Sequence, residues 1–412
     1  MSKLTVVSNE IQAESISLDA LIRKGAQDIV QAAIMQELSL LLSQYSDLKT
    51  PDNLQAIVRN GYLPPREILT ATGSIKIQVP KVRDRNGTGI KFNSTLVPPY
   101  MTRSKALEEF IPWLYLKGVS TGDMSETLHN LLGQQAKSIT PDLVSKLKAG
   151  WLKDHEEWSK RRFDSKDYVY IWADGVYSQV RLGDKLCLLV IMGVTSSGRK
   201  ELIAVHDGMR ESEQSWRELL VDLRERGLKA PKLAVGDGAM GFWSALTKIY
   251  PQTQKQRCWF HKMGNVLNKF PTAMQSSVKK ALQNIWMAST REAAEKAYRQ
   301  FITTYKDKYP KAVGCLDKDQ EELLAFYDYP ALHWPHIRTS NPIESMFATI
   351  RQRSTRTKNC GSRDTTLMMV FKLGETAQKG WNRLNGFSHL AEIIQGVKFK
   401  DGIRVEKLAY AG

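Results

Sequence analysis

The spacing of apolar residues along the chain changes twice before residue 160. Residues 1–60 are expected to be helical, because the stretch 13–45 carries apolar side chains at helical spacing. Between 61 and 84, prolines, a Thr-Gly turn and the alternation of Ile75, Ile77 and Val79 predict a short strand. For the cations on or beside this strand we favour a solvated face over a DNA contact; they are Lys76, Lys81, Arg83 and Arg85.

Helical spacing returns in residues 104–158. Three short apolar-periodic runs are separated by breaks at Gly118 and Gly133, and Ser or Thr residues stand at their starts. Three such helices are compatible with a helix-turn-helix unit and also with any small helical bundle. We expect residues 61–160 to form a DNA-binding region with helix-turn-helix-like helices.

A different pattern begins near residue 165. Alternating or continuous apolar runs predict three strands, and then a helix, a strand, a second helix and a fifth strand follow, up to QKQRCWF. This order predicts a mixed α/β sheet. From Lys262 to His333 the spacing is only helical, which indicates an inserted or flanking helical unit.

Composition narrows the class of protein. The chain has 412 residues, enough for two or three domains, and its 42% hydrophobic content is that of a globular protein. Lys and Arg number 59 against 43 Asp and Glu, so the net charge of +16 favours a nucleic acid as partner. The longest apolar run, 186–194, is too short to span a bilayer. Four cysteines and an N-terminus unlike a secretory signal indicate a cytoplasmic protein.

Two aspartates end predicted strands in similar contexts. Asp174 lies late in the first strand and Asp237 ends the fourth, and a glycine follows each of them. If the fourth strand lies beside the first, both carboxylates emerge at one crevice, where they would suit Mg²⁺. The alternative is that each Asp-Gly pair only marks a turn.

Glu344 is a third candidate carboxylate. Asn341 as N-cap, Pro342 as first helical residue and Glu344 further on predict the start of a helix, which would also hold the carboxylate rigidly. Beyond it the helix becomes basic, and Arg351 lies about two turns after Glu344. A DNA contact and a solvated face are equally good interpretations of this row, which consists of Arg351, Arg353, Arg356 and Lys358.

Cys258 and His261 have the spacing of half a zinc site. A structural zinc takes four ligands, and no matching pair is evident, so we favour a buried thiol beside a hydrogen-bonded histidine and expect no zinc. The chain also lacks the GxxxxGK[ST] loop of ATP-driven motors.

Four ordered blocks resemble those of Mutator-type bacterial insertion-sequence transposases: WADGVYSQVR, VGDGAMGFWSAL, QRCWFHKMGNVLNKFP and TSNPIESMFATIRQRS. The resemblance implies a ribonuclease-H-like catalytic core with a DDE triad of Asp174, Asp237 and Glu344, and it matches Cys258 and His261 to the family's C/D-x-x-H element. The core would comprise 161–261 and, with Glu344 and basic C-terminal helices, 336–412. An all-helical insertion, 262–335, would separate these two parts.

The same resemblance implies the chemistry and the partners. Two Mg²⁺ ions, with Mn²⁺ as a substitute, would be bound by the triad, with Asp174 bridging both. The N-terminal region would bind the terminal inverted repeats, and a homodimer on the bacterial nucleoid would hold paired ends and target DNA. A plain metal-dependent nuclease and a domesticated, non-catalytic DNA-binding protein are the alternatives; a glycosidase would leave the charge of +16 unexplained.

Overall fold

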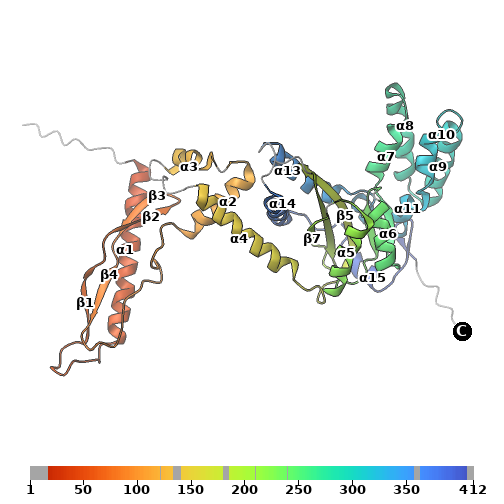
Figure 1. Cartoon of the computed structure of the whole chain (residues 1–412). Coiled ribbons are helices and arrows are strands. Elements are labelled where there is room, and N and C mark those ends of the chain that lie inside the picture. The colour runs from red at the N-terminus through yellow and green to blue at the C-terminus, as the bar shows by residue number, and fades with distance from the viewer. Residues whose placement is uncertain are drawn as a thin grey trace, which may run out of the picture. The chain divides into compact units, whose positions relative to one another are not determined.

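The computed structural model describes residues 17–120, 122–132, 141–179, 185–208, 210–238, 240–356 and 362–405 (Figure 1). The chain divides into two compact units, Met1–Leu147 and Lys148–Gly412. The division falls within helix α4 (Pro141–Ser159). Each unit is described by itself.

The first unit packs one long helix on short strands. Helix α1 (Leu18–Gln44) begins after Ser17, whose hydroxyl accepts a hydrogen bond from the Ala20 amide. Ile34 and Leu38 lie about one turn apart on α1 and are buried against isoleucines of the strands. The strands form two antiparallel pairs, β1 (Ile57–Tyr62) with β4 (Pro80–Asp84) and β2 (Arg66–Thr70) with β3 (Gly73–Ile77).

This arrangement differs from the expectation of a helix up to residue 60 and a single strand. The helix ends at Gln44, and strand β1 already begins at Ile57. Four of the six residues of β1 are exposed, so no apolar alternation marks it in the sequence. The alternating Ile75 and Ile77 belong to the buried face of β3.

Helices occupy the positions expected for residues 104–158. They are α2 (Lys105–Lys117), α3 (Met124–Leu132) and α4. Gly118 ends α2 in the left-handed conformation, with φ of 117°, which favours glycine. Residues 133–140, which contain the second predicted break, lie outside the described residues, and the helix-turn-helix interpretation stays a prediction.

A five-stranded mixed sheet is the centre of the second unit. Its strands are β5 (Tyr168–Gln179), β6 (Lys185–Thr195), β7 (Lys200–Asp207), β8 (Leu233–Gly236) and β9 (Gln254–Arg257). Their order is β7-β6-β5-β8-β9. Strand β6 pairs antiparallel with both β7 and β5, whereas β8 pairs parallel with both β5 and β9. The fourth strand, β8, therefore lies beside the first, β5, which is the condition for Asp174 and Asp237 to emerge at one crevice.

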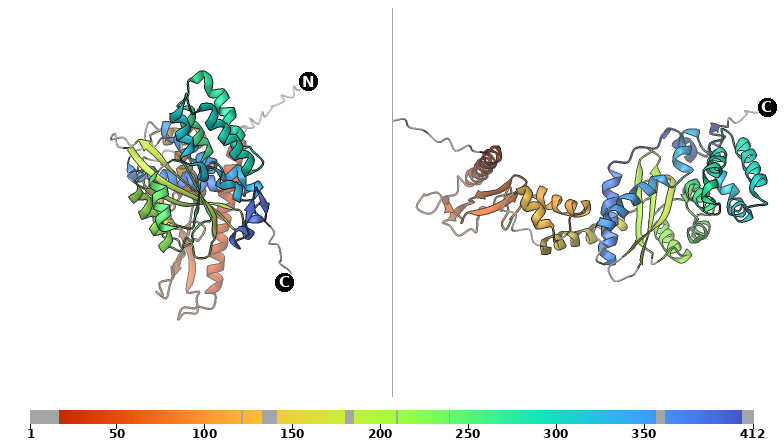
Figure 2. Two further views of the ribbon diagram at one scale, coloured as in Figure 1. Left: turned by 90° about the vertical axis from the view of Figure 1, so that its right-hand side faces the viewer. Right: turned by 90° about the horizontal axis from the view of Figure 1, so that it is seen from above.

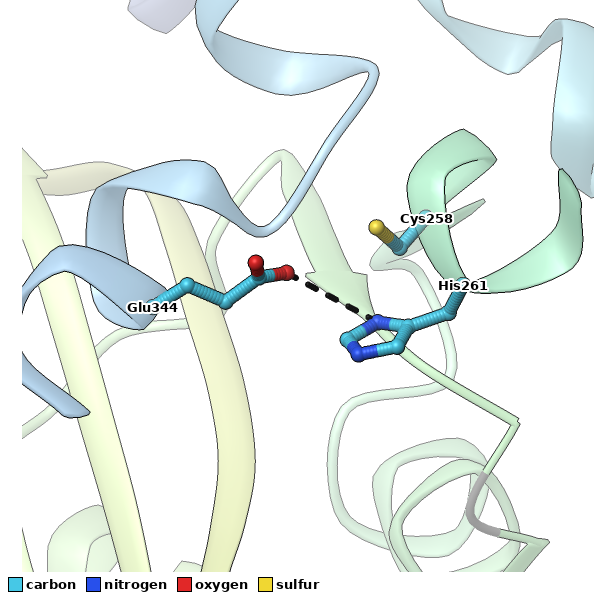
Figure 3. A group of neighbouring side chains, drawn as sticks. All are labelled: Cys258, His261 and Glu344. Atoms are coloured by element: carbon cyan, nitrogen blue, oxygen red, sulfur yellow. Dashed lines mark ion pairs between the residues drawn. The ribbon is translucent and has the colours of Figure 1, made fainter. Parts of the chain in front are cut away.

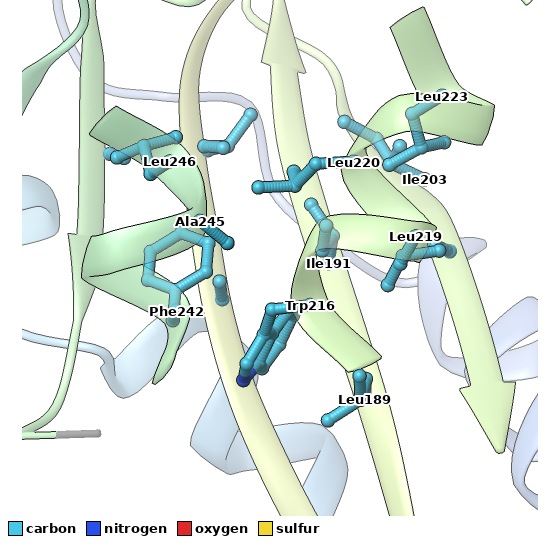
Figure 4. Close-up of a cluster of buried hydrophobic side chains, with 14 of the residues drawn as sticks. Leu189, Ile191, Ile203, Trp216, Leu219, Leu220, Leu223, Phe242, Ala245 and Leu246 are labelled. Atoms are coloured by element: carbon cyan, nitrogen blue, oxygen red, sulfur yellow. The ribbon is translucent and has the colours of Figure 1, made fainter. Parts of the chain in front are cut away.

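Helices cover both faces of this sheet (Figure 2). On one face α5 (Glu213–Glu225) and α6 (Met240–Ile249) bury an apolar cluster that includes Trp216, Leu219 and Leu223 (Figure 4). On the other face α13 (Asn341–Arg356) packs on β5 and α14 (Arg363–Gln378) packs on β7. Gly374 of α14 lies so close to Leu202 that a Cβ there would be 2.8 Å from the leucine side chain.

Between β9 and α13 the chain is helical throughout, as the spacing predicted. The α-helices are α7 (Trp259–Leu267), α8 (Thr272–Trp286), α9 (Arg291–Tyr305), α10 (Pro310–Asp317), α11 (Gln320–Leu324) and α12 (Trp334–Ile337). Two 3₁₀ turns, η2 (Ala325–Asp328) and η3 (Ala331–His333), connect the last two of them.

After α14 the chain forms α15 (His389–Ile394) and a small hairpin that the sequence did not predict, β10 (Phe399–Lys400) with β11 (Ile403–Arg404). Its strands are too short for a pattern of alternation, and its turn at Asp401 and Gly402 depends on two positive φ angles. Among the residues that the structure describes, no helix has the length and apolar character needed to cross a membrane.

Candidate active site

Asp174 and Asp237 leave neighbouring parallel strands at the same level. Ala173 is paired with Gly236 in the register of β5 and β8, and each aspartate is the next residue along its strand. Adjacent strands lie about 4.8 Å apart, so the two carboxylates begin close together. Burial, and then the charge of Asp237, raise the pKa of Asp174 to about 7. The structure thus brings together the first two predicted site residues.

The backbone that follows β8 is held by two side chains. The carbonyl oxygen of Asp237 accepts hydrogen bonds from Trp243 Nε1 at 2.8 Å and from the guanidinium of Arg257. Arg257 is only 6% exposed, and it also contacts Asp319 at 3.2 Å. Lys262, equally buried, donates to Asp319 and to the Cys315 carbonyl. Two buried cations that share one carboxylate, at the end of the sheet, favour negative charge nearby.

Glu211 is a further carboxyl group here that the sequence reasoning missed. It precedes Ser212, the N-cap of α5, and a Cβ at Gly175 would lie 1.4 Å from its Oε1. The Glu211 side chain thus fills the space beside β5 that Gly175 leaves open. Burial and the charge of Asp237 raise the pKa of Glu211. No local pattern marked this residue, because its neighbours Gly175 and Asp237 are distant in sequence.

Glu344 stands in the first turn of α13, on a helix start that differs by one residue from the prediction. Asn341 is the first helical residue, and the Ser340 carbonyl accepts the Glu344 amide at 3.1 Å, so Ser340 takes the place before the helix that was expected for Asn341. Pro342 is tolerated at the second position because that amide also has no partner within the helix. The Ser340 hydroxyl donates to Glu344 Oε1 at 2.6 Å.

The side chains of Cys258 and His261 lie next to that of Glu344 (Figure 3). Cys258 is buried, and its amide donates to the Gly236 carbonyl at 2.8 Å, which ties the end of β9 to the end of β8. One ligand atom from each of the three residues lies within 4.8 Å of the other two. The Cys258 thiol is buried, as expected, and His261 Nδ1 lies 3.4 Å from the Ser340 hydroxyl, whereas the absence of zinc stays a prediction. Glu344 as their neighbour could not be found from spacing.

His261 connects this group electrostatically to the aspartates. Its Nδ1 lies 3.8 Å from Glu344 Oε1. The hydrogen bond with the Cys258 sulfur, followed by the charges of Cys258, Glu344 and Asp174, raises the pKa of His261 to about 9, although burial acts in the opposite direction. In turn, His261 lowers the pKa of Asp174. All three candidate carboxylates therefore share one electrostatic environment.

The basic row after Glu344 is only partly described. Arg351 is exposed on α13. Lys358 and the side chains of Arg353 and Arg356 lie outside the described residues. Further along, Arg363 donates two hydrogen bonds to Asp207, at 2.9 and 2.6 Å, and so fixes the start of α14 to the end of β7.

The carboxylates around β5 and the end of β8 fit a hard divalent cation. Asp174, Asp237, Glu211 and Glu344 offer carboxylate oxygens, which Mg²⁺ prefers. The raised pKa of Asp174 reflects burial and repulsion by Asp237, and a cation bound by both carboxylates would relieve the repulsion.

The comparison with known proteins is consistent with the sequence blocks. The family model described as "Transposase, Mutator family" matches residues 1–383. The chain is 51% identical over 282 residues to the transposase for insertion sequence element IST2 of Acidithiobacillus ferrooxidans, covering 68% of this chain and 95% of that protein. It is 43% identical over 302 residues to the transposase for IS6120 of Mycolicibacterium smegmatis, covering 73% of this chain and 93% of that protein. The chain belongs to the Mutator family of transposases.

Proposed function

We propose that this protein is a DNA transposase that binds the terminal inverted repeats of an insertion sequence and catalyses Mg²⁺-dependent DNA cleavage and strand transfer. The observation that carries the proposal is the position of Asp174, within β5, beside Asp237, directly after the parallel strand β8, with Glu344 brought to the same environment by α13. Relatives at 51% and 43% identity are named as insertion-sequence transposases, which supports it.

The core of this enzyme is, in our proposal, ribonuclease-H-like. Three antiparallel strands followed by two parallel ones, in the order β7-β6-β5-β8-β9, support this assignment. So does the pairing of helices α5 and α6 on one face with α13 and α14 on the other. The helical segment between β9 and α13 is an insertion into that core.

The catalytic residues are Asp174, Asp237 and Glu344, which would hold two Mg²⁺ ions. Such ions activate the attacking oxygen and stabilise the leaving 3′ oxygen of the scissile phosphodiester. The protein's part is to hold the carboxylates in place. Asp237 is fixed through its carbonyl by Trp243 and Arg257, and Glu344 by the first turn of α13.

DNA would be bound electrostatically on several surfaces. Arg351 is exposed about two turns beyond Glu344 on α13, and we propose that it contacts phosphates together with Arg353, Arg356 and Lys358. Residues 61–160 would recognise the terminal repeats. A homodimer would hold two transposon ends for joining to target DNA in the bacterial cytoplasm.

A strand-transfer assay tests this function. The purified full chain is incubated with Mg²⁺, a target plasmid and a duplex that carries the terminal repeat found beside its gene, and Asp237→Asn serves as control. Joined products from the wild type, absent with the control, are expected. Cleavage without joining would instead favour a plain nuclease, and binding without cleavage would favour a non-catalytic DNA-binding protein.

A further inference from the structure

One buried hydroxyl lies among the three residues of the Cys258, His261 and Glu344 cluster. Ser340 is 0% exposed. Its Oγ lies 3.1 Å from Cys258 Sγ, 3.4 Å from His261 Nδ1 and 2.6 Å from Glu344 Oε1. Its amide also donates to Cys258 Sγ at 3.2 Å. The Ser340 hydroxyl therefore contacts every member of the cluster.

The proton of this hydroxyl has a preferred acceptor. A serine has one O–H donor and two acceptor lone pairs, so its three neighbours cannot all accept from it. The carboxylate oxygen at 2.6 Å is charged and lies nearest, and hydrogen bonds to charged acceptors are the stronger ones. Ser340 therefore donates to Glu344, and its lone pairs remain for donors on Cys258 or His261. This hydrogen bond fixes the orientation of the Glu344 carboxylate, which keeps lone pairs for a metal because its two oxygens offer about four.

Zinc is the competing interpretation of the same cluster. A structural zinc site takes four protein ligands, and Cys258, His261 and Glu344 are grouped without a fourth Cys, His, Asp or Glu in the part of the chain that the structure describes. The nearest additional oxygen is the Ser340 hydroxyl, which is a weak ligand in its neutral form. Ser340 is also held by the start of α13 and by its amide bond to Cys258, so it cannot move aside without loosening the helix.

We propose that Ser340 is a positioning residue. Its hydroxyl links Cys258 and His261 to Glu344 and fixes the carboxylate in the orientation that binds the active-site divalent cation. The proposal rests on the proposed function of Glu344. It also gives the Cys-x-x-His pair a role, since the pair supports the orientation of a metal-binding carboxylate instead of holding a metal of its own.

Binding of Mn²⁺ to the full-length protein without DNA tests this role, because it does not depend on turnover. Electron paramagnetic resonance of free Mn²⁺ gives the Kd. Loss of a hydrogen bond that orients a metal ligand costs roughly 10- to 100-fold in metal affinity, and we expect a loss in this range for Ser340→Ala. Ser345→Ala is the matched control, since Ser345 is exposed in the same first turn and its hydroxyl donates to the Pro342 carbonyl. Its Kd should equal that of the wild type.

A double-mutant comparison separates positioning from a merely structural effect. Cys258→Ala should weaken Mn²⁺ binding in the wild type and have little further effect in Ser340→Ala, because Cys258 acts through Ser340. Should Ser340→Ala fail to fold, as judged by circular dichroism, Ser340→Cys keeps a similar shape with only a weak S–H donor and should still lower the Mn²⁺ affinity below that of the Ser345 control. Equal Mn²⁺ affinity for the Ser340 variant and the Ser345 control would overturn the proposal.

Metal analysis of the purified wild type addresses the competing site. Substoichiometric zinc is expected, and one tightly bound zinc per chain that Cys258→Ala removes would overturn the proposal in favour of a zinc site. The two proposals can fail independently. If the wild type joins no DNA but its Mn²⁺ affinity depends on Ser340, the proposed function fails and the positioning role of Ser340 stands.

Discussion

The two faces of the five-stranded sheet are built differently. Facing α5 and α6, strands β6 and β7 present Leu189, Ile191 and Ile203 to Trp216 and other apolar side chains (Figure 4). On the opposite face β5 makes polar contacts: Tyr170 Oη lies 2.7 Å from His333 Nδ1, and Trp172 Nε1 donates to the His336 carbonyl at 3.1 Å. Asp174 continues this second series of alternate residues.

This difference suggests a division of labour. The apolar face depends on volume and shape, and it contributes mostly to stability. The opposite face also packs apolar side chains, such as Leu202 against Gly374, but along β5 it adds specific donors and acceptors that lead to the carboxylates. We call it the polar face for this series of contacts. If the division holds, substitutions on the two faces should separate activity from folding.

The largest effect is expected for Asp174→Asn. Loss of a shared metal-binding carboxylate should lower strand transfer by about 10³-fold or more, roughly 4 kcal/mol of transition-state stabilisation. The folded-state pKa of about 7 lies above the ordinary value of an aspartate, so ionised Asp174 destabilises the metal-free protein as the pH rises towards 7. The neutral amide should therefore raise Tm in metal-free buffer at pH 8. A variant that is inactive only because its Tm falls would contradict the division between faces.

Trp216→Ala probes the apolar face. Trp216 is 1% exposed and packs edge-on against Phe242, with ring centroids 5.0 Å apart. Its truncation should lower the free energy of unfolding by about 3–5 kcal/mol, measured by urea denaturation. Activity per folded molecule should stay unchanged at low temperature, and Trp216→Phe should be milder. A loss of strand transfer in protein that is still fully folded would show that this face also shapes the site.

The polar face should make stability depend on pH through His333. This buried histidine also contacts the Gly386 carbonyl through Nε2 at 2.9 Å, and burial lowers its pKa to about 4. In the unfolded chain His333 has an ordinary pKa of about 6.5, so as the pH falls it takes up a proton there before it does so in the folded protein. The free energy of unfolding therefore decreases by roughly 3 kcal/mol between pH 6.5 and pH 4.

Urea denaturation of wild type and His333→Gln between pH 7 and 4.5 measures this contribution. Glutamine offers one donor and one acceptor without titrating, so the difference between the two proteins should shrink as the pH falls. A difference that does not change with pH would exclude His333 as the source.

The smallest effect is expected for Arg351→Ala. Loss of one phosphate contact should weaken DNA binding about equally for all sequences and reduce the slope of log K against log salt by about one. Gln352→Ala, at the next exposed position of α13, is the matched control. An unchanged slope would make Arg351 part of a solvated face.

Much of the second unit could be predicted because its signals are local. The runs around Asp174, Leu186 to Val194, and Asp237 marked strands that the structure contains, and the helix expected after the third strand is α5. The pairing of β5 with β8, which brings Asp174 to Asp237, followed from the order of elements together with one assumption on strand order.

What could not be predicted depends on contacts between distant segments. Ser340, 82 residues from Cys258, stands at an ordinary helix start and gave no sign that its hydroxyl joins the cluster. The Glu211 side chain fills the space that Gly175 leaves open. Arg257 donates a hydrogen bond to the carbonyl of Asp237, 20 residues earlier in the chain. Strand β1 was missed for another reason, since four of its six residues are exposed.

The most direct test of the proposed active site concerns Glu344, which links the carboxylates of Asp174 and Asp237 to the Cys258 and His261 pair. Joined product from a terminal-repeat duplex is measured as Mg²⁺ is titrated, for the wild type, Glu344→Gln and Glu218→Gln, whose exposed carboxylate on α5 serves as control. We expect product that rises with Mg²⁺ for the wild type and the control, and none for Glu344→Gln although it binds the duplex. Equal joining by Glu344→Gln would remove Glu344 from the active site and contradict the account.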